Sequence, residues 1–531
     1  MASTQRRLRV SVVVKSALAP AWISALVERL DASQRYEVLA FLDTPLVEET
    51  RPTAYRLYER LDARIFAQRH DALAAVALPN LGPSDMAIAG ECDVLLDFGW
   101  RSRDAFVDAP RYGVWMLSLT EQERCRIPPV FWEMYGGDLC LTTLEALLPG
   151  GDRRVLYTSL GRPNRTSLHR SRNAAYWKAQ GAIARALDAV YDRGASYLQS
   201  RPRVEETPIR TERRTPSAST VARHAAKVSF GVVARRLRKI TFREEWFVAI
   251  RTPGRHSLVD QEPESVDDFR PLGAPRGQHF ADPFLFEEGG KTFLFFETYD
   301  EGINRASIAY TQLDVNANTI GPALPALSRD HHVSYPFVFR HRGDIFMIPE
   351  SLEHETVDLF RAVEFPSDWS FEGRLLDRIC AVDATLLEEG SRLWLFVGVA
   401  EPGASVNDEL HLYSSSTLRG PWLPHPENPV VSDVRSARPA GRIFRHDGQI
   451  IRPSQDCSRG YGTAVVFNRI DVLTLSQYAE TAIGRIEPTW SPGLLGTHTY
   501  NCSRHVEAVD GRRFAFRFPI RRPTAHARRR R

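Results

Sequence analysis

Long hydrophobic runs are missing from this chain of 531 residues. No stretch approaches the roughly 20 consecutive apolar residues that a membrane-spanning helix needs. The basic start, MASTQRRLRVSVVVKS, contains an apolar segment shorter than the core of a secretory signal, which has at least about 7 residues. We therefore expect no spanning helix and no signal peptide, and VSVVV is predicted to form a first buried strand.

Cysteine is scarce and shows no recognisable spacing. A CxxC pair or a metal-ligand pattern is absent from the six cysteines, which are Cys92, Cys125, Cys140, Cys380, Cys457 and Cys502. This argues against a disulfide framework and against a zinc motif. We expect reduced thiols in a cytoplasmic protein, with no metal and no cofactor.

A strong net charge is also lacking, since the formal value is only +4 at pH 7. The arginine-rich end, RRPTAHARRRR, exceeds that total by itself, so the rest of the chain is close to neutral. Nucleic acid is therefore not an expected partner. The tail, residues 519–531, is interpreted either as a solvated segment or as an arm that touches anionic surfaces.

The first half of the chain alternates short apolar runs with helical periodicity. A strand–helix–strand pattern at the start is followed by the apolar runs CDVLLDFG and YGVWMLSL. This pattern is typical of parallel sheets. It predicts an α/β doubly wound domain over residues 1–197, with a trailing helix from Arg172 to Tyr191 that Gly194 caps.

Residues 198–242 break this pattern. RPRVEETPIRTERRTPSAST is rich in Pro, Arg, Glu and Thr, a composition typical of linkers. A basic amphipathic segment follows, with Val228, Val232, Val233 and Leu237 among arginines. Either this helix packs its apolar face on a neighbouring domain, or it makes a peripheral contact with an anionic membrane surface such as the inner membrane.

The second half of the chain repeats one motif. HFADPFLFEEGGKTFLFFE is followed by VSYPFVFRHRGDIFMIPE, VDATLLEEGSRLWLFVGVAE and ARPAGRIFRHDGQIIRPSQD, with a fainter copy in HVEAVDGRRFAFRF. Each copy is a hairpin, and spacings of roughly 50 residues are typical of propeller blades. The repeats predict an all-β five-bladed β-propeller over residues 243–518, with EEWFVAIR as the strand that closes the ring.

Equivalent positions of the repeats should meet at one mouth of the propeller. The first strands would bring Asp282, Tyr335, Asp383, Arg438 and His505 together, and the second strands would add Glu297, Glu350, Glu401 and Asp456. Acids at strand ends can simply cap turns and pair with arginines. Crowded carboxylates beside arginines also suit sugar hydroxyls and phosphates. The candidate ligand-binding residues are Glu297, Tyr335, Arg438, Arg442, Arg452, Gln455, Asp456 and His505.

Two motifs are similar to those of known propeller enzymes. Ala281-Asp282-Pro283 and the Asp383 that opens the third repeat resemble arabinanases, xylosidases and levansucrases. That resemblance implies Asp282 as base or nucleophile and Asp383 as its electrostatic partner, and Glu350 is the third catalytic candidate. Arg438 stands where the family has its general acid. A guanidinium does not donate a proton at neutral pH, so hydrolysis by that mechanism is not expected.

A longer series of motifs covers about 270 residues. FADPFLF, SYPFVF, MIPE, DATL, NPV, ARPAGR and SQDC, in this order, resemble the N-terminal domain of glucosamine inositolphosphorylceramide transferase and its bacterial relatives. The resemblance implies work on glycans or glycolipids. The exostosin-like domain that carries the plant protein's transfer chemistry has no counterpart in this sequence.

The first 175 or so residues resemble the N-terminal domain of formyltransferases, through DVLLDFGWRSRDAFVDAPRYGVW and FWEMYGG. The positions of that family's reacting Asn, His and Asp fall on Met116, on Ser118 and near Pro149. These side chains cannot polarise a formyl carbonyl, so folate-dependent chemistry is expected to be lost.

Three functions remain open from the sequence. In the first, the propeller is a carbohydrate-active domain that transfers a glycosyl group in surface glycan or glycolipid assembly. In the second, it is a non-catalytic glycan-binding scaffold for a partner glycosyltransferase. The third is formyl or acyl transfer to an amino sugar by the first domain. The double acidic ring favours the first and Arg438 favours the second. The expected ligand is a sugar, sugar nucleotide or glycolipid.

Overall fold

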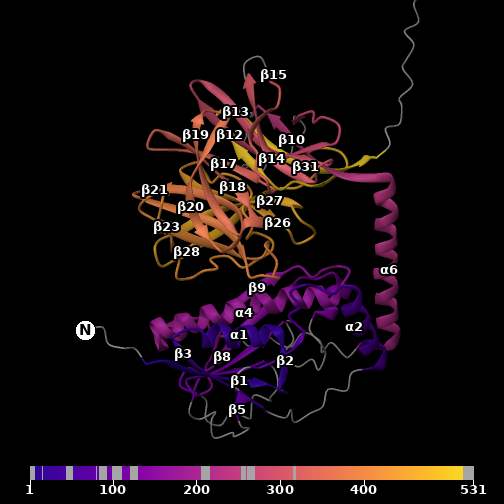
Figure 1. The fold of residues 1–531 in the computed structure, drawn as a ribbon, viewed down its shortest axis with the longest axis vertical. Helices are drawn as coiled ribbons and strands as arrows, with labels where there is room; N and C mark the ends of the chain where they lie inside the picture. Colours follow the sequence, from indigo (N-terminus) through magenta and orange to yellow (C-terminus); the bar gives the residue numbers. More distant parts are fainter. Residues whose placement is uncertain are drawn as a thin grey trace, which may run out of the picture.

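The computed structural model describes residues 6–14, 16–42, 52–78, 81–82, 92–98, 110–119, 130–204, 216–252, 259, 269–314 and 319–517. The chain forms two bodies stacked along the long axis of the molecule, and helix α6 (Ala218–Thr241) runs along one side from one to the other (Figure 1). Within the described ranges, no helix is long and apolar enough to cross a membrane.

The first body contains a mixed seven-stranded sheet in the order β5-β3-β1-β6-β7-β8-β9. Strands β5 to β7 in this order run parallel, and β8 and β9 are added antiparallel. The strands are β1 (Leu8–Val14), β3 (Tyr36–Leu42), β5 (Leu81–Gly82), β6 (Val94–Asp97), β7 (Val114–Ser118), β8 (Cys140–Leu147) and β9 (Arg153–Gly161). A separate ribbon pairs β2 (Leu18–Pro20) with β4 (Ala75–Ala77).

Helices cover one face of this sheet. α1 (Ala21–Asp31) and α4 (Leu168–Arg193) share a core with Val12 and Leu96 of the strands. Val13 and Leu95 point to the opposite face, where they form a small apolar cluster that includes no described helix. The predicted doubly wound arrangement, which needs helices on both faces, is therefore not confirmed.

The remaining helices lie around α4. They are α2 (Thr53–Ile65), α3 (Phe131–Gly136) and α5 (Ala195–Ser200). α4 ends as the sequence predicts, because the N–H of Gly194 donates to the Val190 carbonyl at 2.7 Å. Ile183 and Leu187 are buried on the face of α4 that meets the sheet.

The second body is a five-bladed β-propeller, as the repeats predict. The first blade contains β12 (Gln278–Glu288), β13 (Lys291–Asp300), β14 (Arg305–Asp314), β15 (Thr319–Ile320) and β16 (Leu324–Leu327). The second contains β17 (Ser334–His341), β18 (Asp344–Ser351), β19 (Thr356–Glu364) and β20 (Asp368–Asp377), with the short turn η5 (Leu352–His354). The third contains β21 (Cys380–Glu389), β22 (Arg392–Ala400), β23 (Leu410–Ser415) and β24 (Leu423–Pro424), and the fourth β25 (Phe444–His446), β26 (Gln449–Asp456), β27 (Ala464–Leu473) and β28 (Tyr478–Ile486).

A strand from before the first blade completes the fifth blade. β10 (Phe242–Arg251) pairs along its whole length with β31 (Glu507–Phe516). β11 (Arg270–Pro271), β29 (Leu494–Gly496) and β30 (Tyr500–Cys502) complete this sheet. Because the start and the end of the propeller share one sheet, the ring is closed by hydrogen bonds, as predicted for EEWFVAIR.

The first three blades repeat a backbone irregularity at the same position. Asp282, Tyr335 and Asp383 have φ values of 49°, 46° and 53°, and each lies in a register shift between the first two strands of its blade. Left-handed backbone is costly for residues other than glycine and is retained where the surroundings enforce it. The three side chains are thereby turned in the same way relative to their blades.

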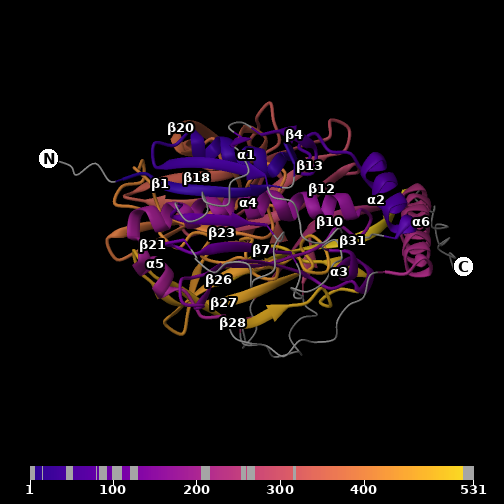
Figure 2. The same cartoon turned by 90° about the horizontal axis from the view of Figure 1, so that it is seen from below.

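The two bodies are joined by buried ion pairs. Lys178 on α4 lies 2.8 Å from Asp408, and Arg185 lies 2.9 Å from Glu409. Figure 2, seen from below, places α6 at the edge of the molecule beside α2, with which it packs. The propeller therefore meets the first body through α4, while α6 stands at the side.

Candidate functional site

A cavity of about 1360 Å³ opens at the propeller mouth, between the inner strands and the C-terminal half of α6. Four of the sequence-predicted residues line it, namely Asp282, Glu297, Glu350 and Arg438. Asp282 lies near the start of β12, and Glu297 and Glu350 lie near the ends of β13 and β18. The antiparallel hairpins therefore return both sets of acids to one opening.

Asp282 is held by groups from two other blades, the second and the fifth. Its Oδ1 accepts a hydrogen bond from Thr499 Oγ1 at 2.7 Å, and its Oδ2 accepts one from the N–H of Tyr335 at 3.2 Å. Burial raises the pKa of Asp282 to about 6, the neighbouring Asp383 and Asp510 add to the shift, and His498 opposes it. This carboxyl group thus titrates close to neutrality, which suits a general base.

His498 connects Asp282 to a second buried acid. Its Nδ1 lies 2.5 Å from Asp510 Oδ2, and its Nε2 lies 3.6 Å from Asp282 Oδ1. The ring stacks on Trp246 with 4.0 Å between centroids. Burial acts to lower the pKa of His498, but Asp510 and Asp282 outweigh it and raise the pKa. The two acids thus face opposite nitrogens of one imidazole ring, and the 3.6 Å separation from Asp282 is longer than a hydrogen bond.

Glu297 and Glu350 are acids of a different kind. Burial raises the pKa of both well above the ordinary range, helped by Asp282 in the first case and by Asp383 in the second. Arg438 opposes the shift at Glu350 without cancelling it. A carboxyl group that keeps its proton at neutral pH can donate it to a leaving oxygen.

Arg438 is a buried cation between two acids. Its Nε lies 2.6 Å from Asp383 Oδ2 and its Nη2 lies 3.4 Å from Glu350 Oε2. The guanidinium also lies over the ring of Tyr461, 4.9 Å from the centroid. The position that opens the fourth repeat therefore supplies fixed positive charge to the cavity wall.

Three predicted residues lie behind this wall instead of lining the cavity. Asp383 accepts from Arg438 and also from Gln455 Nε2 at 3.0 Å. Tyr335 is fully buried, and its hydroxyl accepts from the N–H of Gly441 at 2.7 Å and bonds Thr385. These side chains hold the wall in place but do not touch its open side.

The remaining candidates do not line this cavity. Arg452 makes two hydrogen bonds with Glu480, at 2.6 and 2.7 Å, inside blade four. Asp456 pairs with Arg485 at 3.0 Å, and the guanidinium of Arg442 lies over Phe337 and bonds the Val338 carbonyl. Glu401 lies in the interface with the first body, 3.2 Å from Arg29. The sequence indicates the strand on which each of these residues lies, but it does not indicate the residue with which each side chain pairs.

His505 is also misplaced, for a reason of register. It is exposed in the turn between β30 and β31, where Ser503 donates its N–H to Val506. His505 lies just before β31, which is the second strand of the fifth hairpin, whereas the first strand is β30, so His498 and Thr499, which directly precede β30, occupy the mouth position. The missed signal is the polar segment THTYN, which precedes the strand that contains Asp510.

The outer wall of the cavity is basic. Arg235, Arg238 and Lys239 of α6 line it together with Arg243, Arg276 and Arg517. Trp246, Tyr299 and Phe514 add aromatic surface. The cavity thus combines an acidic floor with a cationic and aromatic rim, an arrangement that accommodates a polyol at one end and a phosphate at the other.

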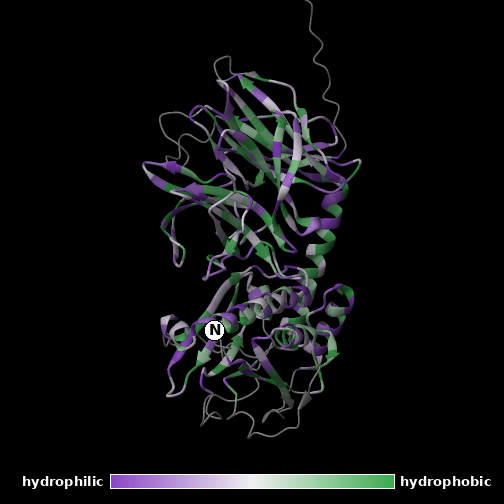
Figure 3. Cartoon of the chain, turned by 60° about the vertical axis from the view of Figure 1, so that its left-hand side comes forward, coloured by the Kyte–Doolittle hydropathy of each residue, from purple (hydrophilic) through white to green (hydrophobic). Residues whose placement is uncertain are grey.

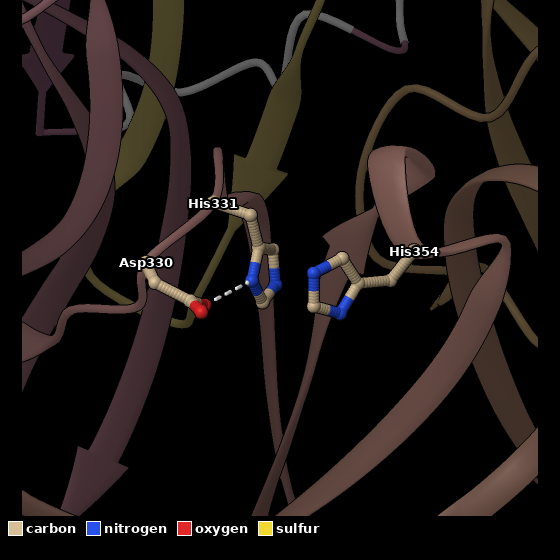
Figure 4. A group of neighbouring side chains, drawn as sticks. All are labelled: Asp330, His331 and His354. Carbon is tan, nitrogen blue, oxygen red and sulfur yellow. Dashed lines mark hydrogen bonds and ion pairs between the residues drawn. The ribbon is translucent and has the colours of Figure 1, made fainter.

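Among the residues that the structure describes, two groups of side chains have the composition of metal ligands. In the first, Asp330, His331 and His354 lie together beside the mouth, with the two imidazole rings face to face at 3.6 Å between centroids and 31° between planes (Figure 4). Ring lone pairs lie in the ring plane, so two stacked rings do not direct their nitrogens at one ion. The second group is Asp282, His498 and Asp510, in which each ring nitrogen already faces a carboxylate.

The comparisons with known proteins agree with a carbohydrate-related propeller. Residues 271–507 match the family described as "Glucosamine inositolphosphorylceramide transferase 1, N-terminal". The protein of that name from Arabidopsis thaliana is 37% identical over 207 residues, which are 38% of this chain and 27% of the plant protein. The one from Oryza sativa subsp. japonica is 36% identical over 207 residues, with 38% and 28% covered. This chain thus spans little more than a quarter of these relatives.

Solved structures similar to this chain include glycoside hydrolases. A thermostable family-43 glycoside hydrolase is 12% identical, with 42% of this chain and 83% of that chain covered and a TM-score of 0.31. A family 117 glycoside hydrolase from Zobellia galactanivorans is 11% identical, with 50% and 90% covered and a TM-score of 0.31. The family match begins at residue 271, and the formyltransferase resemblance of the first 175 residues gains no support.

Proposed function

We propose that the propeller mouth binds a sugar or sugar phosphate and transfers a glycosyl group in the assembly of a surface glycan or glycolipid. The observation that carries this proposal is the pairing, in one cavity, of Asp282 with a pKa of about 6 and Glu350 with a pKa raised well above the ordinary range. Enzymes that cleave glycosidic bonds pair a carboxylate with a protonated carboxyl group in one site, and the same pair serves when the glycosyl group passes to an acceptor other than water.

The residues have distinct roles in this proposal. Asp282 acts as base or nucleophile, and His498 and Asp510 stabilise the charge that it gains or loses. Glu350, protonated beside Arg438, supplies the proton that the leaving oxygen needs. Asp383 is a positioning residue, because its ion pair with Arg438 at 2.6 Å holds the guanidinium in place. The resemblance to glycosidases places its acid at Arg438, so Glu350 takes over that role here.

The substrate class follows from the two ends of the cavity. The acidic floor suits the hydroxyl or amino groups of a sugar, and the rim of Arg276, Arg243 and Arg517 suits a phosphate. The plant relatives are named for a glucosamine and an inositolphosphorylceramide. We therefore propose an amino sugar or inositol carrying a phosphate as ligand.

The alternative is a glycan-binding module that positions a partner glycosyltransferase. The cationic Arg438 at the position of the glycosidase acid favours this alternative, because the family's usual proton donor is absent. Both functions use the same cavity and differ only in turnover.

Isothermal titration with glucosamine, inositol phosphate and a uridine diphosphate sugar tests the binding part. We expect the phosphorylated ligands to bind, and the rim variant Arg276→Gln to weaken them without affecting a neutral sugar. Turnover of a sugar nucleotide that Asp282→Asn abolishes while binding persists supports the enzyme, and binding without turnover in the wild type supports the module. Absence of binding by every ligand would refute both.

A further inference from the structure

Helix α6 turns an apolar face away from the protein. Phe230, Val233, Leu237 and Ile240 are 77%, 54%, 60% and 64% exposed. Their spacing of three and four residues places them in one stripe along the helix, called the outer stripe below. In Figure 3 the hydrophobic and hydrophilic residues of α6 lie next to each other along its free length. An isolated exposed apolar residue is ordinary, but four in one stripe are not.

The opposite face of α6 points inward. Near the start of the helix, Val221 and His224 are buried against α2 and α3. Farther along the same face, Arg235 and Arg238 line the cavity at the propeller mouth. At 100° per residue, these positions are diametrically opposed to the outer stripe. In its C-terminal half the helix therefore keeps its polar side toward the protein and its apolar side outward, whereas Val221 of its first turns packs on the first body.

The sequence left open whether this helix packs its apolar face on a neighbouring domain. The C-terminal half of α6 does not do so. Val233 and Leu237, which that alternative places in an interface, are exposed. Only the first turns of the helix pack on the first body, through α2.

The charge of α6 identifies the occupant of the outer stripe. The helix carries six basic residues and no acidic residue, namely Arg223, Lys227, Arg235, Arg236, Arg238 and Lys239. A second copy of the helix would bring the same charges against each other, which is unfavourable at short distance. An anionic lipid surface offers both an apolar layer for the stripe and negative charge for Arg223, Lys227 and Arg236, which flank the stripe at 100° per residue.

We propose that the outer stripe of α6 inserts into the surface of a membrane that contains anionic lipids. The helix then lies in the plane of the headgroups, and the cavity whose basic wall it forms lies next to them. The placement of the cavity next to the headgroups implies that the glycosyl acceptor or donor is a lipid with a phosphate headgroup, and this implication rests on the proposed function. Membrane attachment itself requires only α6.

Flotation of the full chain with vesicles tests this proposal. Vesicles of phosphatidylcholine alone are compared with vesicles that also contain phosphatidylglycerol, at low and high salt. We expect binding to the anionic vesicles that salt weakens, and a loss of about tenfold or more in Val233→Ser/Leu237→Ser. The matched control is Val363→Ser/Phe371→Ser in blade two, where the side chains are 62% and 54% exposed. The control should bind like the wild type.

Each other outcome overturns the proposal. If the wild type does not float with the vesicles, membrane binding is refuted. Membrane binding by the outer stripe is also refuted if the stripe variant binds equally well at an unchanged melting temperature. If light scattering shows that the wild type is a dimer and the stripe variant is a monomer, the outer stripe is an interface with a second copy of the chain and not a membrane contact. Titration of the stripe variant with soluble inositol phosphate, without vesicles, separates the two proposals. If the wild type does not bind soluble inositol phosphate, the proposed function is refuted, while the flotation result still stands.

Discussion

Two buried acids in this protein have opposite electrostatics. Glu409, in the interface between the two bodies, is 3% exposed and its pKa is lowered to about 2. Asp282, at the propeller mouth, is 5% exposed and its pKa is raised to about 6. Burial acts to raise both values. Arg185 reverses the shift at Glu409, together with hydrogen bonds from His411 and Tyr157, whereas Asp282 has more carboxylates than cations around it.

The difference separates a buried charge that holds structure from one that is available for chemistry. Glu409 has a dedicated cation 2.9 Å away, and the pair joins α4 to the propeller. Asp282 has a histidine at 3.6 Å and an open cavity beside it. Unmatched carboxylates cost stability and are retained where function uses them.

Arg185→Ala should have the largest effect on the free energy of unfolding. It leaves Glu409 buried without its cation, which costs about 3–5 kcal/mol. Urea denaturation at neutral pH measures this loss. Adding Glu409→Gln should restore part of it, since the stranded charge is then removed, and a double variant no more stable than Arg185→Ala would contradict the pairing.

Arg438→Ala should cost less, about 2–3 kcal/mol. Asp383 keeps its hydrogen bond from Gln455, and burial raises the pKa of Glu350 well above its ordinary range, which disfavours a negative charge at this second partner of Arg438. The same denaturation experiment ranks the two arginines. Equal losses would show that the mouth is held together like the interface.

Asp282→Asn should stabilise the protein by about 1–2 kcal/mol at pH 8 and leave it unchanged at pH 4. The pKa of the acid rises from 3.8 unfolded to about 6 folded, so the wild type loses stability as the pH rises through this window. The asparagine variant has no such loss. Melting curves at the two pH values test the sign, and destabilisation at both would make Asp282 a structural acid.

Arg29→Ala should have the smallest effect, below about 0.5 kcal/mol. Arg29 lies 3.2 Å from Glu401 at the rim of the same interface, but its side chain is 43% exposed and water screens the pair. A loss comparable to that of Arg185→Ala would show that distance, and not burial, decides the contribution of these pairs.

Much of the propeller was predictable because its information is local and repeated. The period of the hairpins predicted five blades, and the shared position within the repeat predicted that Asp282 of the first blade and Asp383 of the third blade lie at the same height and that Glu297 and Glu350 reach the same opening. The closure by β10 also followed, because an apolar strand before the first repeat has no other blade to join. Each of these conclusions needs only strand alternation and repeat symmetry.

The sequence by itself thus determined the second fold and the acids of the cavity floor. Only the tertiary structure decided that Arg452 turns to Glu480, that His498 in place of His505 completes the mouth, and that the apolar side of α6 faces outward. These outcomes depend on side chains brought together from distant strands and on which segment forms the first strand of the last hairpin, and a one-residue change of register reverses the face of a strand. The geometry of a single helix likewise defines two faces without saying which of them meets the protein.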